Sequence, residues 1–323
     1  MVGTAFVTGG SGFVGGHLIE RLVGAGWTVR ALARSAAAAS AVAARGAEPV
    51  RGDLASAESV RAGAAGAELA FHAAATVSEW APRAEFVAGN VTGTANVIAG
   101  TRDAEVQRLV HVSTEAVLLN GRPLVRVDET APLQPASPVP YVATKAMAEQ
   151  LVRAADDGVF ETVVVRPRLI WGPRDTTILP GLVDSIRRGR FTWIGGGRHL
   201  TATTHVANAV EGLIRAAEQG ERGQVYFVTD GDPVEFRDFV TRLVSTAGHV
   251  PPARSLPASV AAPLASVAET VWSAARVTST PPLTRLRYWL SAHECTIDIS
   301  RARTDLGYTP VITRDDGLSA LAQ

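Results

Sequence analysis

Short apolar runs alternate along the chain with segments in which apolar residues recur every three or four positions. A short apolar run is typical of a buried strand, and the longer spacing is typical of an amphipathic helix. The predicted strands are residues 4–8, 28–33, 48–51, 69–72, 108–113, 162–166 and 224–228. Because strands that alternate with helices usually pair in parallel, the pattern predicts an α/β protein built on a doubly wound parallel sheet.

A glycine-rich turn follows the first predicted strand, and an amphipathic helix begins directly after it. Glycine allows a tight turn and lets backbone N–H groups approach a pyrophosphate, which the positive end of the helix dipole favours. In this strand–turn–helix context the spacing predicts a Rossmann-type dinucleotide site. The expected cofactor-binding residues of the turn are Gly9, Gly10, Ser11, Gly12, Phe13, Val14 and Gly15.

The ends of the second and third predicted strands bear on the choice of cofactor. An acidic residue that would hold the ribose of NAD is replaced by Ala33, followed by Arg34 and Ser35. An arginine accommodates the 2′-phosphate that a carboxylate would repel, so we favour NADP(H), with NAD(H) and a merely solvated Arg34 as the alternatives. Asp53, which precedes Leu54, either contacts the adenine amino group or caps a helix.

Lys145 is the only lysine of the chain, and it stands four residues after Tyr141. On a helix this spacing places both side chains on one face. A neighbouring ammonium lowers the pKa of a phenol from its usual value of about 10. The pair therefore indicates a proton-transfer residue, Tyr141, although an ordinary surface pair has the same spacing.

The composition excludes several classes of function. The chain has 323 residues with 31 acidic and 31 basic side chains, so no basic excess points to nucleic acid. The lone Cys295 rules out an internal disulfide and fits a cytoplasmic location. We find no spacing typical of metal ligands and no apolar run long enough to span a membrane.

Together the motifs resemble the extended short-chain dehydrogenase/reductase superfamily, also called the NAD-dependent epimerase/dehydratase family. Within it the chain is most similar to the 3β-hydroxysteroid dehydrogenase-like branch, through residues 193–206 and 225–230. The motifs of the superfamily are Thr8 to Gly15, Gly52-Asp-Leu54, His72-Ala-Ala-Ala75, Val110-His-Val-Ser-Thr114, Tyr141-x-x-x-Lys145 and Arg166-Pro-x-x-x-Trp-Gly-Pro173.

The resemblance implies roles for particular residues. Tyr141 would be the catalytic acid/base, and Lys145 would lower its pKa and hold the nicotinamide ribose. Of the two hydroxyls that end the fifth strand, Thr114 would orient the substrate oxygen, while Ser113 would face the sheet. Further catalytic or cofactor contacts are implied at Ala73, Ala74, Ala75, Lys145, Arg166 and Pro167. Asn90 either supports a water or backbone contact or lies on a helix surface, and His205 either approaches the cofactor or serves capping and packing.

We expect residues 1–172, with a returning segment 204–228, to form the dinucleotide-binding domain. Residues 173–203 and 229–323 would form a smaller, mostly helical, substrate-binding lobe. That lobe is rich in apolar residues, which favours a hydrophobic substrate and is compatible with peripheral contact with a membrane. The superfamily commonly forms homodimers through the helix that carries the tyrosine.

Two departures from the family pattern bear on the activity. Leu169 stands where sugar-nucleotide epimerases usually have asparagine, and Ala116 stands where the dehydratases have a second carboxylate. We therefore predict an NAD(P)-dependent oxidoreductase acting on a hydrophobic secondary alcohol or ketone, sterol-like or a long-chain 3-hydroxy/3-oxo compound. The alternatives are a sugar-nucleotide epimerase or dehydratase and a non-catalytic NADP-binding scaffold.

Overall fold

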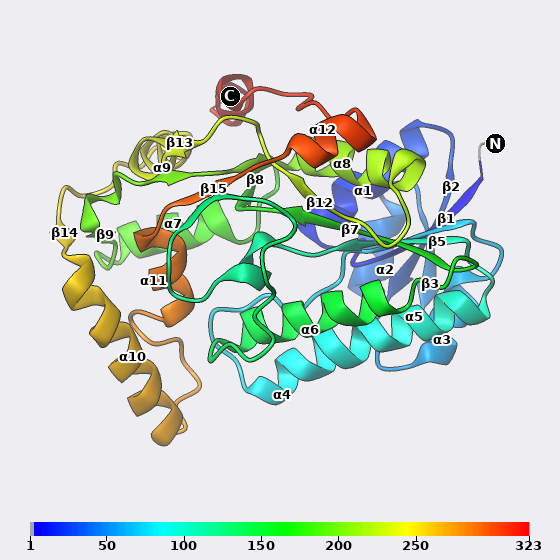
Figure 1. Ribbon diagram of the computed structural model, residues 1–323, viewed down its shortest axis with the longest axis horizontal. Coiled ribbons are helices and arrows are strands. Elements are labelled where there is room, and N and C mark those ends of the chain that lie inside the picture. The colour runs from blue at the N-terminus through cyan, green and yellow to red at the C-terminus, as the bar shows by residue number, and fades with distance from the viewer. Residues whose placement is uncertain (1–2, 323) are drawn as a thin grey trace.

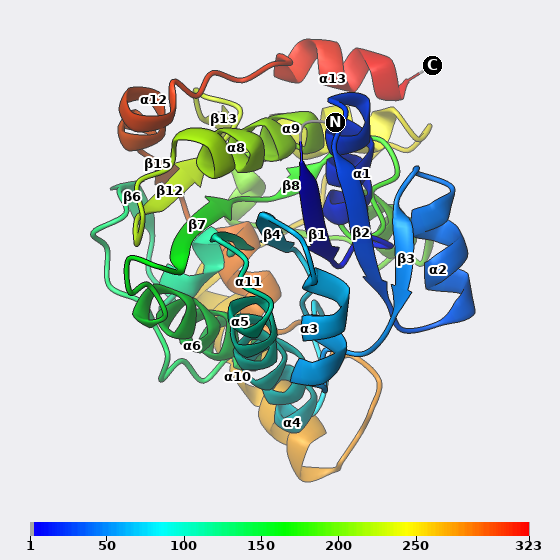
Figure 2. The same ribbon diagram turned by 90° about the vertical axis from the view of Figure 1, so that its right-hand side faces the viewer.

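A seven-stranded parallel sheet lies at the centre of the computed structural model, which describes residues 3–322 (Figures 1 and 2). The strand order is β12-β7-β5-β4-β1-β2-β3, and every neighbouring pair is parallel. Its strands are β1 (Thr4–Thr8), β2 (Thr28–Ala33), β3 (Glu48–Arg51), β4 (Leu69–His72), β5 (Arg108–Val112), β7 (Glu161–Pro167) and β12 (Val225–Val228). The doubly wound α/β fold is confirmed, and the predicted strands agree with these bounds to within a residue at either end.

Helices cover both faces of this sheet. Figure 2 shows α1 and α8 on one face and α3, α5 and α6 on the other. The helices of this part are α1 (Phe13–Gly24), α2 (Ala36–Ala43), α3 (Ala57–Ala64), α4 (Arg83–Phe86), α5 (Gly93–Asp103), α6 (Pro140–Ala154) and α8 (Val206–Gln219), with the π-helix η1 (Val87–Thr92) and the 3-10 helix η2 (Glu115–Leu118). Because the sheet is covered on both faces, consecutive residues of its inner strands are buried, as Ala5, Phe6 and Val7 show.

The part of the structure outside the main sheet and its covering helices contains three small sheets. Its helices are α7 (Ile178–Arg187), α9 (Phe236–Ser245), α10 (Ala258–Ala274), α11 (Arg285–Ala292), α12 (Ser300–Leu306) and α13 (Arg314–Leu321), with the 3-10 helix η3 (Gly195–Gly197). Its short strands are β6 (Leu124–Val127), β8 (Ile170–Trp171), β9 (Trp193–Ile194), β10 (Leu200–Thr201), β11 (Thr204–His205), β13 (Val234–Glu235), β14 (Ser255–Leu256) and β15 (Cys295–Ile297).

The pairing of two segments bears on the regions expected from the sequence. Strand β12 of the segment 204–228 pairs with β7, so this segment returns to the main sheet. Strand β6, which falls within residues 1–172, pairs instead with β15 in the four-stranded sheet β13-β10-β15-β6. The division of the chain at residue 172 stays a prediction.

The order of the main sheet marks where a ligand should bind. The chain progresses outward from β1 through β2 to β3, and in the opposite direction from β4 through β5 and β7 to β12. In open parallel sheets, ligands bind beyond the carboxyl ends of the two strands at which this direction reverses. Those two strands are β1 and β4, and the predicted glycine turn follows the first of them.

Candidate active site

The glycine turn after β1 and the segment after β4 approach each other too closely for side chains. Gly9 has a φ of 76°, and a Cβ on it would lie 2.6 Å from the backbone of Ala73. A Cβ on Gly15 would lie 2.3 Å from the carbonyl oxygen of Gly9. No side chain caps α1 at Gly12, so its first N–H groups face this turn without a side-chain partner. The turn therefore has the backbone cradle that a dinucleotide pyrophosphate requires.

Asn90 holds the segment after β4 against α6. The side chain is 2% exposed, and its Oδ1 accepts a hydrogen bond of 2.7 Å from the backbone N–H of Thr76. Its Nδ2 donates to the carbonyl of Thr76 at 3.2 Å and to the hydroxyl of Thr144 at 3.1 Å. The alternative of a helix-surface asparagine is therefore wrong, and the backbone contact is the one that forms.

Lys145 reaches from α6 to the end of β5. Its Nζ donates a hydrogen bond of 2.8 Å to the carbonyl of Val112 and lies 3.5 Å from Nε2 of His111. The side chain is 3% exposed, and burial lowers the pKa of Lys145 to about 8, against the raising effect of Glu149. The ammonium is thus fixed near the carboxyl ends of the strands, beside a neutral histidine.

Tyr141 is half-buried in the first turn of α6, and the Thr114 hydroxyl lies beside its phenol. Burial raises the pKa of Tyr141 above its ordinary value, the Glu115 carboxylate raises it further, and the neighbouring Thr114 hydroxyl offsets part of this. The expectation that Lys145 lowers the pKa of Tyr141 is therefore wrong for this chain. The reason is that burial disfavours the charged phenolate, and the carboxylate of Glu115, which the motif does not reveal, adds to this effect.

The hydroxyls at the end of β5 have separate partners. Ser113 donates a hydrogen bond of 2.7 Å to Glu149, which also forms a buried ion pair of 2.5 Å with Arg166. Thr114 donates a hydrogen bond of 2.9 Å to Glu115. Ser113 thus lies in the interior, as expected from the sequence, and Thr114 is the hydroxyl beside Tyr141.

Sequence reasoning missed the buried charges behind these hydroxyls. Glu115 forms an ion pair with Arg168, and both side chains are almost completely shielded from solvent. Glu149 stands four residues after Lys145, a spacing that could have drawn attention to it. Arg168 offers no such local signal, because its partner is 53 residues away in the chain.

A family model described as the 3-beta hydroxysteroid dehydrogenase/isomerase family matches residues 6–258. The chain belongs to this family. It is therefore an oxidoreductase of the short-chain dehydrogenase/reductase type, with a nicotinamide dinucleotide as its class of cofactor. Bound in the glycine cradle, that cofactor would accept or supply a hydride.

Similar proteins cover nearly the whole chain. A "4-hydroxy-2-methyl-3-oxo-4-farnesyl-3,4-dihydroquinoline-1-oxide ketoreductase" of Stigmatella aurantiaca is 50% identical over 318 residues, 98% of this chain and 95% of that protein. A "2-alkyl-3-oxoalkanoate reductase" of Stenotrophomonas maltophilia is 35% identical over 326 residues, covering 98% and 97%.

Solved structures have the same fold. The crystal structure of gox2253 has a TM-score of 0.79 at 28% identity and covers 99% of this chain and 97% of its own. The UDP-glucuronic acid 4-epimerase of Bacillus cereus in complex with NAD has a TM-score of 0.73 at 20% identity and covers 98% and 96%. At that identity, the second likeness concerns the fold alone.

Arg34, Ser35 and Asp53, which the sequence also predicts to bind the cofactor, have different surroundings in the structure. Arg34 is exposed directly after β2, whereas the hydroxyl of Ser35 accepts a hydrogen bond of 3.1 Å from the N–H of Ala38 and caps α2. The carboxylate of Asp53 accepts one of 2.9 Å from the N–H of Ala55. Ser56 is the residue that caps α3, so the helix-cap alternative for Asp53 is wrong.

Two predicted residues have clear structural roles. The Arg166 side chain has no exposed surface and lies between Glu149 and the ring of Phe227, so a cofactor contact would have to come from its backbone. His205 caps α8 by accepting a hydrogen bond of 3.2 Å from Ala207, which favours the capping alternative. Among residues 3–322, no group of three or more His, Cys, Asp and Glu side chains could hold a metal ion.

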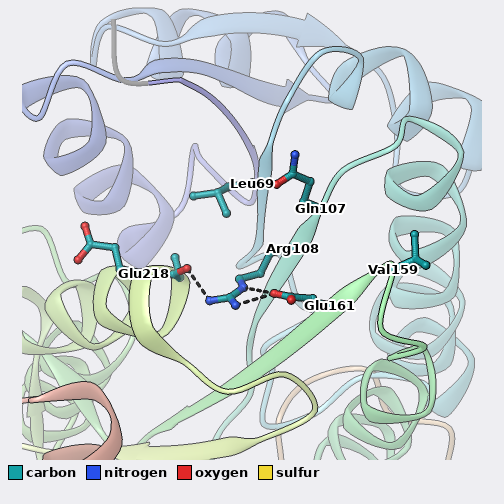
Figure 3. Close-up of a pocket in the computed structure, with 7 residues that line it drawn as sticks. Leu69, Gln107, Arg108, Val159, Glu161 and Glu218 are labelled. Carbon is teal, nitrogen blue, oxygen red and sulfur yellow. Dashed lines mark hydrogen bonds and ion pairs between the residues drawn. The ribbon is translucent and has the colours of Figure 1, made fainter.

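A surface pocket lies away from this site, at the amino ends of the strands (Figure 3). Its residues include the first residues of β4, β5 and β7, namely Leu69, Arg108 and Glu161. Arg108 forms an ion pair of 2.5 Å with Glu161 and donates to the carbonyl of Ala217 at 2.8 Å. Because Arg108 is paired with Glu161 and the pocket lies at the opposite ends of the strands from Tyr141, we assign this pocket no part in catalysis.

Proposed function

We propose that this protein is an NAD(P)H-dependent ketoreductase for a hydrophobic ketone, sterol-like or a long-chain 3-oxo compound, with the corresponding secondary alcohol as product. The observation that carries the proposal is the contact between Tyr141 and Thr114 at the carboxyl edge of the sheet, near the glycine cradle. The two similar proteins named as a ketoreductase and a reductase of 3-oxoalkanoates support the same chemistry.

In this proposal Tyr141 is the acid that protonates the carbonyl oxygen as hydride reaches the carbonyl carbon. The raised pKa of Tyr141 supports the reductive direction, because a phenol with a raised pKa stays protonated and able to donate at neutral pH. Thr114 orients the phenol and the substrate oxygen, and Lys145 holds the ribose of the cofactor. Ser113 belongs to the support of the site through Glu149.

For the cofactor we propose NADP(H), with NAD(H) as the weaker alternative. The exposed Arg34 stands directly after β2, and no carboxylate occupies that strand end. Contacts to the cofactor are proposed for the glycine turn, for Asp53 and Leu54, and for Ala73 to Ala75. Contacts at Ser35, Arg166 and Pro167 would involve the backbone, because Ser35 caps a helix and the other two are buried.

The alternative functions have less support. A dehydratase needs a second carboxylate, and the residue in that place is Ala116. Glu115, the carboxylate that is present, is engaged by Arg168 and Thr114. A non-catalytic scaffold would not need a chain that has Thr114, Tyr141 and Lys145 all present. Sugar-nucleotide chemistry and the scaffold therefore remain the alternatives that experiment should exclude.

We further propose that the protein binds membranes peripherally through α10, which projects from the body in Figures 1 and 2. Its exposed apolar side chains have spacings of four, three and four residues and so form one stripe: Val260, Leu264, Val267 and Val271. The exposed Arg276 follows the helix, where it would meet anionic head groups. Among the described residues no helix is long and apolar enough to cross a bilayer.

We also propose a homodimer and a cytoplasmic location. A homodimer would form through the face of α5 and α6, which lie side by side. A cytoplasmic location is supported by the single cysteine, Cys295, which is free and buried.

The test of the function is cofactor turnover with a mixed set of ketones. Absorbance of the reduced nicotinamide is followed with NADPH or NADH and 3-oxo steroids, long-chain 3-oxo compounds or UDP-sugars. We expect NADPH oxidation with an apolar ketone, loss of turnover in Tyr141→Phe by a factor of at least ~10², and unchanged NADPH binding in that variant. Conversion of a UDP-sugar without net cofactor oxidation would show the epimerase alternative to be correct.

A further inference from the structure

Seven buried side-chain atoms have no hydrogen-bond partner among residues 3–322, and three of them are nitrogens around the small four-stranded sheet. These three are Nη2 of Arg168, Nε2 of His199 and Nε2 of His293. Arg168 is 1% exposed as a whole residue. Buried polar atoms are usually paired, because leaving one unpaired costs about 1–3 kcal/mol. Three such atoms from three segments of the chain therefore point to a missing polar group.

The small four-stranded sheet brings these segments together. Strands β10 and β15 are parallel, with Thr201 opposite Cys295. His199 directly precedes β10, and His293 ends α11 two residues before β15, so both stand next to these paired strands. Arg168 reaches β10 directly, since its Nε donates a hydrogen bond of 3.1 Å to the hydroxyl of Thr201.

A single residue, Glu115, links Arg168 to the hydroxyl of Thr114. Nη1 of Arg168 donates to Glu115 Oε1, and the other carboxylate oxygen accepts the hydroxyl hydrogen of Thr114. Thr114 in turn contacts Tyr141. Arg168 is therefore joined to the site of Tyr141 through Glu115 and Thr114.

The charges of this cluster are balanced within the chain. The positive charge of Arg168 is matched by the buried carboxylate of Glu115. Burial, followed by the charges of Arg168 and His293, lowers the pKa of His199 to about 4, and burial lowers that of His293, so both are neutral at pH 7. A carboxylate placed here would be a buried charge without compensation, which is unfavourable.

We propose that Arg168, His199 and His293 form a polar subsite that binds a second, uncharged oxygen of the substrate close to its reacting ketone. Arg168 donates to this oxygen, and the two imidazoles complete its hydrogen bonds. The subsite rests on the proposed ketoreductase function and adds a preference among ketone substrates to it. It would favour ketones that carry a neighbouring hydroxyl, ester or amide oxygen over plain ketones and over 3-oxo acids.

The test compares three ketones of equal chain length: a 3-oxo methyl ester, the matching 3-oxo acid and a ketone with no second oxygen. We expect the wild-type protein to have its highest kcat/KM for the ester. In His199→Phe and His293→Phe, the ratio of kcat/KM for the ester to that for the plain ketone should fall by about 3- to 10-fold, the effect of losing one hydrogen bond. Phenylalanine preserves the ring packing of His199 against Phe236 and leaves the Glu115–Arg168 pair untouched.

His249→Phe is the matched control, because His249 lies in the same lobe outside the cluster. It should leave the ratio unchanged, and NADPH binding and thermal unfolding should be the same in all variants. The rise in melting temperature that the ester causes in each protein gives the same comparison without turnover.

Other results would overturn the proposal. Equal turnover of ester and plain ketone, or a ratio unchanged in both histidine variants, would mean that only water occupies the cluster. A preference for the 3-oxo acid would show that the subsite takes an anion. No turnover of any ketone would instead refute the proposed function itself, which distinguishes the two failures.

Discussion

Ser113 and Thr114 are adjacent in the chain, yet their hydroxyls donate to two different buried carboxylates, Glu149 and Glu115. The backbone at Thr114 is still extended, and successive residues of extended backbone point in opposite directions. One hydroxyl is therefore part of the interior and the other belongs to the site. Each carboxylate is paired with an arginine of the segment at the end of β7, Arg166 or Arg168.

This arrangement predicts opposite consequences for two alanine substitutions. Thr114→Ala should lower kcat by roughly 10²-fold with little loss of stability, because it removes a hydroxyl beside the reacting oxygen. Ser113→Ala should lower the free energy of unfolding by about 1–3 kcal/mol and spare kcat, because it removes a buried hydrogen bond to a charged group. Urea unfolding and steady-state kinetics on both variants check this, and a catalytic loss in Ser113→Ala larger than in Thr114→Ala would contradict it.

The pH dependence of reduction should follow Lys145 on its alkaline side. The pKa of Tyr141 is raised, so the phenol remains protonated and able to donate at neutral pH. The pKa of Lys145 is lowered to about 8, so its positive charge is present below that pH and is lost above it. We expect kcat/KM for NADPH to be constant up to about pH 8 and to fall beyond it. In Lys145→Arg, whose guanidinium stays charged, any remaining activity should lack this decline.

Arg34 should decide between the two cofactors. Arg34→Ala should lower kcat/KM for NADPH by about 10- to 100-fold, the effect of one lost charge-assisted hydrogen bond, and leave that for NADH unchanged. Arg153→Ala removes another exposed arginine, on α6, and should change neither value. An equal loss with both cofactors would show that Arg34 does not contact the 2′-phosphate.

The apolar stripe of α10 should contribute to membrane binding. Leu264→Ser and Val267→Ser each remove an exposed apolar side chain worth roughly 1–2 kcal/mol of burial, so each should weaken binding to anionic vesicles by about 10-fold. Val311→Ser is the control, since Val311 is 57% exposed but lies outside the stripe. Sedimentation with vesicles measures the bound fraction, and equal binding of all three variants would refute the assignment.

Much of the fold followed from local patterns. The predicted strand 4–8, the glycine turn and the helix after it agree with β1, the cradle and α1, because turn chemistry and periodicity act over a few residues. The small sheet was not predicted. Its strands have only two to four residues, and β6 pairs with β15 although Arg126 and Thr296 are 170 residues apart in the chain. Pairing at that distance leaves no local periodicity.

The candidate site, like the fold, was predicted only in part from the sequence. The spacing of the motif indicated Tyr141 and Lys145, the resemblance to the superfamily implied Thr114, and the structure places Thr114 beside Tyr141. The direction of the Tyr141 pKa was predicted wrongly, because the effect of burial and of Glu115 depends on how the folded chain encloses the phenol.

By itself, the sequence determined the order of strands and helices, the glycine cradle and the residue types available for proton transfer, since these depend on near neighbours in the chain. Only the tertiary structure decided which charges are buried together. The Glu115–Arg168 pair and the unpaired nitrogens of Arg168, His199 and His293 arise from segments far apart in sequence. The cost of burying a charge or a polar atom depends on what surrounds it in space, and that surrounding exists only once the chain has folded.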